Sequence, residues 1–418
     1  MSKSGYNKKV LVIGSCWPEP RSSAAGVRMM QLMLHFSLDG EVWFACHAGK
    51  TGNEANLKSS GINERQIILN SDTFDEWVSA LKPDVVVFDR FITEEQYGWR
   101  VARSAPQALR ILDTEDLHFL RKSRQHQVKN GLKEPDFFCD DTVIRELASI
   151  YRSDLSLIIS KYELELLTGY FGVPPKLLMY LPFFETTPGS HKSAGFCERG
   201  GLAFIGHARH EPNRDAMDHL CKDILPLVRK KLPSIELHLA GAYMSNHLKS
   251  KLAKVPGVVV YGFVPDAREF IARHRLLVAP IRFGAGLKGK IVDAFATNTP
   301  VITTPVGAEG FSAVDWPGAV VDNTNGFVKA VVEGYTNRST WERWRAQCAR
   351  HYAEFTVQKG HAQKLNDRLV ELAMHIDEHR RSNLIGRILA HQSMRSTEYF
   401  SKWLALKEEL KAIRTGQV

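Results

Sequence analysis

Strand-sized apolar runs alternate with helical stretches along most of this 418-residue chain, and the alternation forms two separate series. The first run, Val10–Ile13, is apolar on both faces, as a parallel strand covered by helices on both sides must be. The expected strands of the first series are Val10–Ile13, Glu41–Cys46, Gln66–Leu69, Asp84–Phe88, Leu109–Leu112 and Leu155–Ser160. Those of the second are Leu202–Ile205, Ile235–Ala240, Val258–Tyr261, Leu276–Ala279, Val301–Thr303 and Ala319–Val321. Each series predicts an open parallel sheet wrapped by helices, so we expect an α/β protein with two Rossmann-like domains.

A segment rich in Pro, Gly, Ser and Thr, residues 182–200, separates the two series and carries no periodicity. Such composition is typical of a linker. Beyond about residue 340 the pattern becomes wholly helical. The expected organisation is a first domain at 1–185, a linker at 186–200, a second domain at 201–345, helices at 346–380 that cross back over the first domain, and a helical tail at 381–418.

Charge and cysteine usage narrow the class of protein. The chain has 55 Lys and Arg against 46 Asp and Glu, a net charge of +9. This excess suits an anionic ligand or an anionic membrane surface, and because no basic-aromatic module is present, we do not expect a nucleic-acid partner.

The six cysteines lie far apart, without zinc-site spacing, which is typical of reduced cytosolic proteins and predicts no metal site. We find neither an apolar run of about 18 residues nor a signal-peptide pattern, and so expect a soluble, cytoplasmic protein.

The last forty residues, 379–418, hold eight Lys or Arg against three Asp or Glu, together with many apolar side chains. A basic amphipathic helix of this kind can lie on an anionic bilayer, which would make the protein peripheral on the cytoplasmic face of a membrane. It can equally pack as an added helix or form a homo-oligomer contact. The sequence leaves both interpretations open.

Candidate binding residues follow the expected strand ends, where ligands of open parallel sheets lie. The loop from Gly14 to Gly26 is built of small residues and leaves amides free for an anion, but its spacing is not that of a dinucleotide fingerprint. After the first strand of the second series, Gly206 is followed by His207 and Arg209 at the start of a helix. Cations beside a helix N-terminus form a phosphate site in physical terms.

The segment 279–311 is the most informative. Three glycines interleave with Lys288 and Lys290 before a helix opens, and lysines at a positive helix end suit a diphosphate. Asp293, in the first turn of that helix, can reach ribose hydroxyls. A second glycine loop follows, in which Gly307 and Gly310 flank Glu309.

Residues 201–335 resemble the nucleotide-sugar-binding half of GT-B glycosyltransferases. The matching stretches are GLAFIGHARHEPNRDA, LPSIELHLAGA, GVVVYGFVPD, GAGLKGKIVDAFATNTPVITTPVGAEG and GAVVDN. The resemblance is strongest to the large retaining glycosyltransferase family 4, the glycosyl transferases group 1. The first half is similar more loosely, through SSAAG, LDTEDLHFLR and ISKYELELL.

Two departures from the family pattern bear on the donor site. Of the two acids that the family spaces eight positions apart, the ribose-binding one corresponds to Asp293, but the sugar-binding one falls on Ala285. The family's Arg and Lys after the first strand of this half fall on His207 and Pro212. We expect Lys288 and Lys290, with Arg209, to supply the missing charge.

The resemblance implies a retaining, metal-independent hexosyltransferase that moves a sugar from a nucleotide-sugar donor to a glycan or lipid-linked acceptor, as in polysaccharide biosynthesis. The nucleotide sugar is a substrate, and no cofactor is expected. The catalytic candidates are Lys288, Lys290, Glu309, Asp113 and His118. The donor-binding candidates are Gly14, Gly26, Gly206, His207, Arg209, Gly286, Lys288, Lys290, Asp293, Gly307 and Glu309.

Two other functions remain open. A nucleotide-sugar epimerase of the same architecture would need acids on both sides of the sugar, and no clear paired set is present. A non-catalytic relative that only binds a nucleotide sugar would fit the loss of the acid at Ala285. The retained glycines, the lysines and Asp293 argue against such a decayed site.

Overall fold

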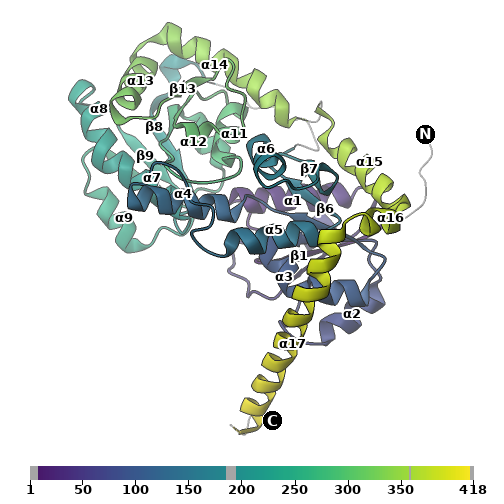
Figure 1. The fold of residues 1–418 in the computed structure, drawn as a ribbon. Helices are drawn as coiled ribbons and strands as arrows, with labels where there is room; N and C mark the ends of the chain where they lie inside the picture. The colour runs from purple at the N-terminus through teal and green to yellow at the C-terminus, as the bar shows by residue number, and fades with distance from the viewer. Residues whose placement is uncertain (1–7, 185–193, 357–358, 415–418) are drawn as a thin grey trace.

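The computed structural model describes residues 8–184, 194–356 and 359–414. Two parallel sheets, each wrapped by helices, form two domains that face one another (Figure 1). The doubly wound α/β fold predicted from the sequence is therefore confirmed. Most of the predicted linker, at 185–193, lies outside the described residues.

The N-terminal domain is built on a seven-stranded sheet in the order β3-β2-β1-β4-β5-β6-β7. Its strands are β1 (Lys8–Gly14), β2 (Gly40–Cys46), β3 (Asn63–Gln66), β4 (Val85–Asp89), β5 (Leu109–Asp113), β6 (Leu155–Ile158) and β7 (Leu178–Tyr180). The helices are α1 (Ala24–Phe36), α2 (Thr73–Leu81), α3 (Arg90–Ser104), α4 (His118–Asn130), α5 (Thr142–Arg152) and α6 (Lys161–Glu165). Helix α6 continues into one turn of π-helix over Leu166–Tyr170, and short 3₁₀ turns lie at Lys58–Ser60 and Pro175–Leu177.

The C-terminal domain has a six-stranded sheet in the order β10-β9-β8-β11-β12-β13. Its strands are β8 (Gly200–Ile205), β9 (Leu237–Ala240), β10 (Val258–Gly262), β11 (His274–Ala279), β12 (Val301–Thr303) and β13 (Gly318–Val320). The helices are α7 (Glu211–His219), α8 (Leu225–Lys231), α9 (Asn246–Ala253), α10 (Ala267–Ala272), α11 (Gly289–Ala296), α12 (Pro305–Ala308), α13 (Thr324–Thr336) and α14 (Arg338–Tyr352). One turn of π-helix at Leu220–Ile224 joins α7 to α8, and short 3₁₀ turns lie at Phe196–Glu198 and Ala353–Phe355.

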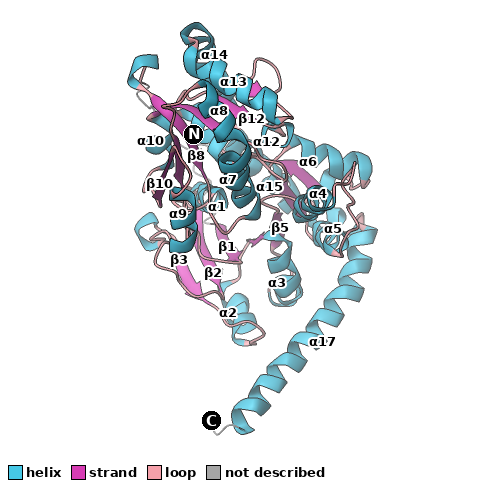
Figure 2. Ribbon diagram, turned by 90° about the vertical axis from the view of Figure 1, so that its left-hand side faces the viewer, coloured by secondary structure: helices cyan, strands magenta, loops and turns pink. Residues whose placement is uncertain are grey.

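Three further helices follow: α15 (His361–Met374), α16 (Ile376–Arg381) and α17 (Leu384–Arg414). The apolar stripe Leu365, Leu369 and Leu372 of α15 packs into the N-terminal core together with α1. The C-terminal end of the chain thus returns to the first domain (Figure 2). None of the helices in the described part of the chain has the length and apolar character needed to cross a membrane.

Two strand predictions differ from the structure. The expected strand Gln66–Leu69 lies earlier, at Asn63–Gln66, on the exposed edge of the sheet where apolar patterning is weak. The short edge strand β7 escaped prediction because its three residues follow a proline-containing turn.

The N-terminal core contains a buried ion pair. Arg28 of α1 and Asp113 at the end of β5 have fully buried side chains, and Arg28 Nη2 donates to Asp113 Oδ1 at 2.7 Å. Arg28 Nη1 also donates to the main-chain oxygen of Leu181 at 2.7 Å. The pair therefore connects α1, β5 and the segment that follows β7.

We predict that Arg28→Ala lowers the free energy of unfolding by about 3–5 kcal/mol, because it leaves the Asp113 carboxylate buried without its partner. Lys50→Ala, which breaks the exposed pair with Glu64, is the control and should cost at most about 1 kcal/mol. Urea denaturation followed by circular dichroism measures both changes. Equal stability of the two variants would contradict the structural role of the pair.

Candidate functional site

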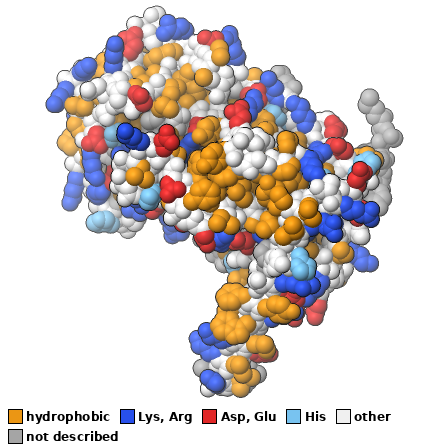
Figure 3. All heavy atoms as spheres, viewed as in Figure 1, with side chains coloured by type: hydrophobic (Ala, Val, Ile, Leu, Met, Phe, Trp, Pro, Cys, Tyr) orange, Lys and Arg blue, Asp and Glu red, His pale blue; other side chains and the backbone are white. Residues whose placement is uncertain are grey.

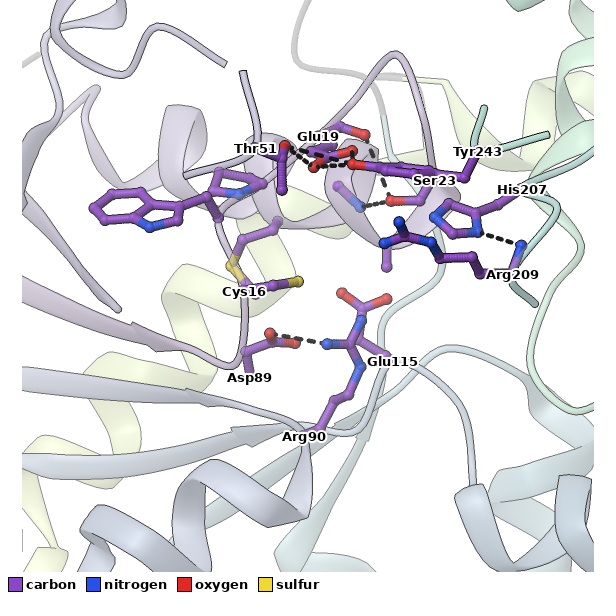
Figure 4. Close-up of a pocket in the computed structure, with 15 residues that line it drawn as sticks. Cys16, Glu19, Ser23, Thr51, Asp89, Arg90, Glu115, His207, Arg209 and Tyr243 are labelled. Carbon is purple, nitrogen blue, oxygen red and sulfur yellow. Dashed lines mark hydrogen bonds and ion pairs between the residues drawn. The ribbon is translucent and has the colours of Figure 1, made fainter. Parts of the chain in front are cut away.

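A cleft of about 550 Å³ lies between the two domains, at the carboxyl ends of both sheets. Loops after β1, β5, β8 and β11 line it, together with the N-terminal turns of α1, α7 and α11. A smaller pocket of about 240 Å³ adjoins it on the N-terminal side (Figure 4). The residues that line both are Cys16, Ser23, Ala25, Arg90, Glu115, His207 and Arg209.

Two lysines at the N-terminus of α11 line the cleft: Lys288 precedes the helix and Lys290 lies in its first turn. Lys288 Nζ donates to the main-chain oxygen of Gly286 at 2.8 Å, and Lys290 Nζ donates to Asn213 Oδ1 at 2.7 Å. Lys290 Nζ also lies 4.2 Å from the ring centroid of Phe204. Neither lysine forms an ion pair within the described residues. The cleft therefore presents two cations that lack an anionic partner.

Burial lowers the pKa of both lysines. The pKa of Lys288 falls to about 8, and the carboxylate of Glu309 opposes part of that shift. The pKa of Lys290 falls to about 7, through burial and the neighbouring charge of Lys288. An anion that entered the cleft would raise both values again, so its binding would be coupled to proton uptake.

The β8–α7 loop adds polar groups to the same wall. His207 and Arg209 both line the cleft, and the Arg209 guanidinium lies 4.2 Å from the ring centroid of Tyr243. Burial lowers the pKa of His207 and lowers that of His210 to about 4, so both imidazoles are neutral at neutral pH. Arg209 is thus the charged member of this loop at the cleft.

Asp293 lines the cleft from α11, as expected for a group that contacts a ribose. Its Oδ1 accepts from Arg268 Nε at 2.9 Å. The side chain remains 28% exposed, so the carboxylate is held in place yet can still be reached.

The N-terminal domain contributes a group of charged residues at the ends of β4 and β5. Arg90 and Glu115 adopt left-handed φ angles of 69° and 62°, which non-glycine residues rarely do. Strained backbone of this kind is concentrated at functional sites. Burial raises the pKa of Glu115 well above its usual range, although the Arg90 guanidinium acts in the opposite direction. Figure 4 shows the Glu115 carboxylate beside that guanidinium and directed into the smaller pocket.

His118 and Asp116 lie beside this group and line the cleft. Burial lowers the pKa of His118 to about 3, despite the nearby Asp116 carboxylate. Burial alone would raise the pKa of Asp116, but Arg121, which forms an ion pair with it, and His118 hold it below its usual range. The predicted catalytic candidate His118 is therefore a neutral imidazole at the cleft.

Asp113, a second catalytic candidate, does not line the cleft. Its carboxylate is fully buried and bound to Arg28. We correct its expected catalytic role to a structural one, because the ion pair with Arg28 turns the carboxylate into the core of the domain.

Glu309, also a catalytic candidate, is likewise absent from the cleft lining. Its two carboxylate oxygens accept from Arg124 of α4 at 2.9 and 2.6 Å. Arg124 Nη1 also donates to the main-chain oxygen of Gly284 at 2.9 Å. The Glu309 carboxylate therefore connects the domains, and in this conformation it does not face a ligand in the cleft.

The loop between β11 and α11, residues 280–288, is called the donor loop here. Its glycines, with Gly289 at the start of α11, bring the domains together. Gly286 has a φ of 64°, and a Cβ there would lie 2.9 Å from Asp116 Cβ, while a Cβ on Gly289 would lie 2.7 Å from Ala24 Cβ. The amide of Gly286 donates to the buried Glu163 carboxylate at 2.8 Å. Larger residues at either glycine would push the domains apart.

The other glycine candidates have different surroundings. Gly206 lines the cleft and Gly26 the smaller pocket. Gly14 packs against Phe44, and Gly307 donates its amide to Thr304 Oγ1 at the start of α12, so neither lines the cleft. Gly14 and Gly307 therefore shape the loops and do not line the site.

Sequence reasoning overlooked several residues of the site. Arg90, Arg121, Arg268 and Tyr243 lie on other elements and reach the cleft or the adjoining pocket only through the fold. Nothing in their local sequence marks them. Within the described residues, no group of three or more His, Cys, Asp or Glu side chains is placed to hold a metal ion.

Comparison with known proteins is consistent with this geometry. Residues 199–337 match the model of the family described as glycosyl transferases group 1. No curated protein matches the chain by sequence. The resemblance found in the sequence is confirmed for the C-terminal domain.

Solved structures share the two-domain fold. Sucrose-phosphate synthase from Thermosynechococcus elongatus is 12% identical with a TM-score of 0.63, over 88% of this chain and 99% of that one. Alr3699/HepE from Anabaena, in complex with UDP and glucose, is 13% identical with a TM-score of 0.64, over 88% and 100%. TarM from S. aureus, in a complex that contains UDP, is 10% identical with a TM-score of 0.56 over 72% of this chain. The match spans only 58% of the TarM chain. At these identities the comparison establishes the GT-B fold.

The contact between the domains generates a prediction. Arg124→Met removes the bonds to Gly284 and Glu309, each worth about 1.5–3 kcal/mol for a charged donor. The amide of Gly286, which donates across the interface to Glu163, should then exchange with deuterium at least about tenfold faster. Arg145→Met, which breaks the pair with Glu95 inside the N-terminal domain, is the matched control. Unchanged exchange of residues 283–289 in Arg124→Met would contradict the assignment of Arg124 as a domain connector.

Proposed function

We propose that this chain, whose residues 199–337 match the model of the glycosyl transferases group 1, transfers a sugar from a nucleotide-sugar donor to a glycan or lipid-linked acceptor. The observation that carries the proposal is the pair of half-buried lysines at the cleft that form no ion pair among the described residues, with Asp293 on the same helix as Lys290. Two cations beside a helix N-terminus suit a diphosphate, and a carboxylate one turn further suits a ribose. UDP in the complexes of Alr3699/HepE and TarM makes UDP the first nucleotide to test.

The proposed reaction requires stabilisation of a leaving diphosphate. As the bond between the anomeric carbon and the phosphate oxygen breaks, negative charge grows on the diphosphate. Lys288, Lys290 and Arg209 line the cleft around the N-terminus of α11, and we assign them, with the first amides of that helix, to the charge that develops there. Fixed cations and dipoles at such a place provide electrostatic catalysis. In this proposal the protein's own cations, and no metal, neutralise the leaving group.

We assign the sugar to the part of the cleft between Ala285 and His118. Both residues line it, whereas the Glu309 carboxylate is bound to Arg124. The acceptor hydroxyl would attack on the face that the diphosphate leaves and pass its proton to the departing phosphate, so the anomeric configuration is retained. The acceptor itself would lie in the smaller pocket between Trp17 and Tyr243, since that pocket opens into the cleft. The six free cysteines support a reducing, cytoplasmic location for the reaction.

We predict that one nucleoside diphosphate raises the thermal stability of the wild type. The panel to test is UDP, GDP, ADP, CDP and TDP. A ligand at one hundred times its Kd adds about 2.7 kcal/mol of stability. Lys290→Ala should weaken that affinity by about 10-fold to 100-fold, because it removes a charged donor to the diphosphate. Lys251→Ala, on an exposed helix of the same domain, is the control. A wild type that responds to no nucleotide would overturn the proposal.

The lowered pKa values of the lysines predict a pH dependence. In the free protein Lys290 and Lys288 lose their protons as the pH rises through about 7 and about 8. Diphosphate affinity should therefore fall between pH 7 and 9, by at most about tenfold per pH unit for each lysine. Lys290→Arg keeps its charge throughout this range, so it should remove the part of the decline that begins near pH 7. Titration calorimetry at several pH values measures this, and an affinity independent of pH would contradict the assigned roles.

A further inference from the structure

The last helix, α17, leaves the body of the protein. Its 31 residues begin against α3 and α5 and then continue outward as a single rod (Figures 1 and 2). Asn383 Nδ2 donates to the main-chain oxygen of Tyr151 where the helix begins. At Ser401, Oγ donates to Asn70 Oδ1 at 2.8 Å and accepts from Arg100 Nη2 at 3.2 Å. These contacts fix which side of α17 faces the N-terminal domain.

The opposite side carries an exposed apolar stripe, which we call the α17 seam. Its members follow one another at intervals of four, three, four and three residues: Tyr399, Trp403, Leu406, Leu410 and Ile413. Each is between 53% and 69% exposed, whereas Ser401 on the other side is 5% exposed. Phe400 stacks on Trp403 and widens the seam at its inner end. A contiguous exposed apolar face on a projecting helix marks an interaction site.

Charge is arranged around the seam in an ordered way. Lys407 and Arg414 lie on one side of it, at about 100° of rotation per residue. On the other side lie Lys402, which pairs with Glu398 at 2.6 Å, and Glu409. Lys407 Nζ is 4.9 Å from the ring centroid of Trp403. Glu408 lies on the far side of the helix from the seam. Cations that border an apolar face of aromatic and aliphatic side chains match an anionic, apolar surface.

A second apolar area lies on the same face of the molecule. Figure 3 shows hydrophobic side chains gathered over α4 to α6 as well as on the projecting part of α17. Large exposed apolar side chains of that region are Leu132, Phe138, Ile144, Tyr162 and Tyr170. The partner that covers α17 can therefore be broad enough to meet the N-terminal domain also.

A second copy of the chain fits this pattern less well. In a parallel pair of helices, a residue beside the seam meets the residue five positions later in the partner. Lys402 would then face Lys407 of the second copy and Glu409 would face Arg414, so one repulsive and one attractive pair leave that register without a net gain from charge. A bilayer that contains anionic lipids meets the basic flank, Lys407 and Arg414, with opposite charge, each Lys or Arg being favourable near such a surface.

We propose that α17 docks on an anionic membrane surface, with the α17 seam among the lipid headgroups and acyl-chain ends. The Tyr399, Phe400 and Trp403 rings lie nearest the protein body, and Leu406, Leu410 and Ile413 extend the apolar contact outward. The docking does not depend on what the cleft binds. It would hold the cleft close to a membrane without any helix crossing it.

The test is co-sedimentation of the full chain with vesicles of phosphatidylcholine alone or with 30% phosphatidylglycerol. The seam variant Leu406→Glu/Leu410→Glu should lower partition onto anionic vesicles at least about tenfold, since it places two carboxylates in the apolar face. The matched control, Ala405→Glu/Ala412→Glu, adds the same charge on the other side of the helix and should stay within about threefold of wild type. Circular dichroism verifies that both variants are folded.

The outcomes separate the possible partners. Binding to anionic vesicles that weakens between 0.1 and 0.5 M salt, and that only the seam variant loses, supports the proposal. Absence of vesicle binding by the wild type overturns it, as does equal loss in both variants. A wild-type dimer in sedimentation velocity that the seam variant converts to monomer, without vesicle binding, would assign the seam to a second copy instead.

Discussion

The close approach of the donor loop to the N-terminal domain determines the rest of the site. The amide of Gly286 donates to Glu163, and Gly289 lies against Ala24 where only a hydrogen can fit. These contacts place the N-termini of α11 and α1 next to each other, so that both strand-end surfaces face one enclosed space. The cleft exists because glycine allows the two backbones to come this close.

Enclosure in turn sets the electrostatics of the cleft. Lys288 and Lys290 lose solvent when the domains meet, and their pKa values fall because burial disfavours the charged form, which the Glu309 carboxylate offsets only in part at Lys288. Protonated lysines in such surroundings favour an anion strongly, whereas the neutral His207, His210 and His118 can only accept or donate hydrogen bonds. We therefore expect the cleft to favour a ligand that brings its negative charge to the α11 side.

The fold and much of the α11 wall could be predicted from the sequence. Parallel strands buried on both faces have a strong signal, and the lysines lie among glycines directly after such a strand. The roles of Glu309 and Asp113 could not be predicted, because their partners, Arg124 and Arg28, are 185 and 85 residues away along the chain. The proximity of Arg90 and Glu115 could not be predicted either. Neither residue type favours a left-handed backbone, so that conformation is imposed by the fold. Gly286 was predicted to bind the donor, but it lies against the other domain and is not among the residues that line the cleft.

The most direct measurement is a crystal structure of the protein with the nucleoside diphosphate that stabilises it. The account predicts diphosphate oxygens within hydrogen-bond distance of Lys288 Nζ and Lys290 Nζ, and ribose hydroxyls at the Asp293 carboxylate. A nucleotide bound elsewhere, or one bound in the cleft with its phosphates turned away from the α11 N-terminus, would contradict it.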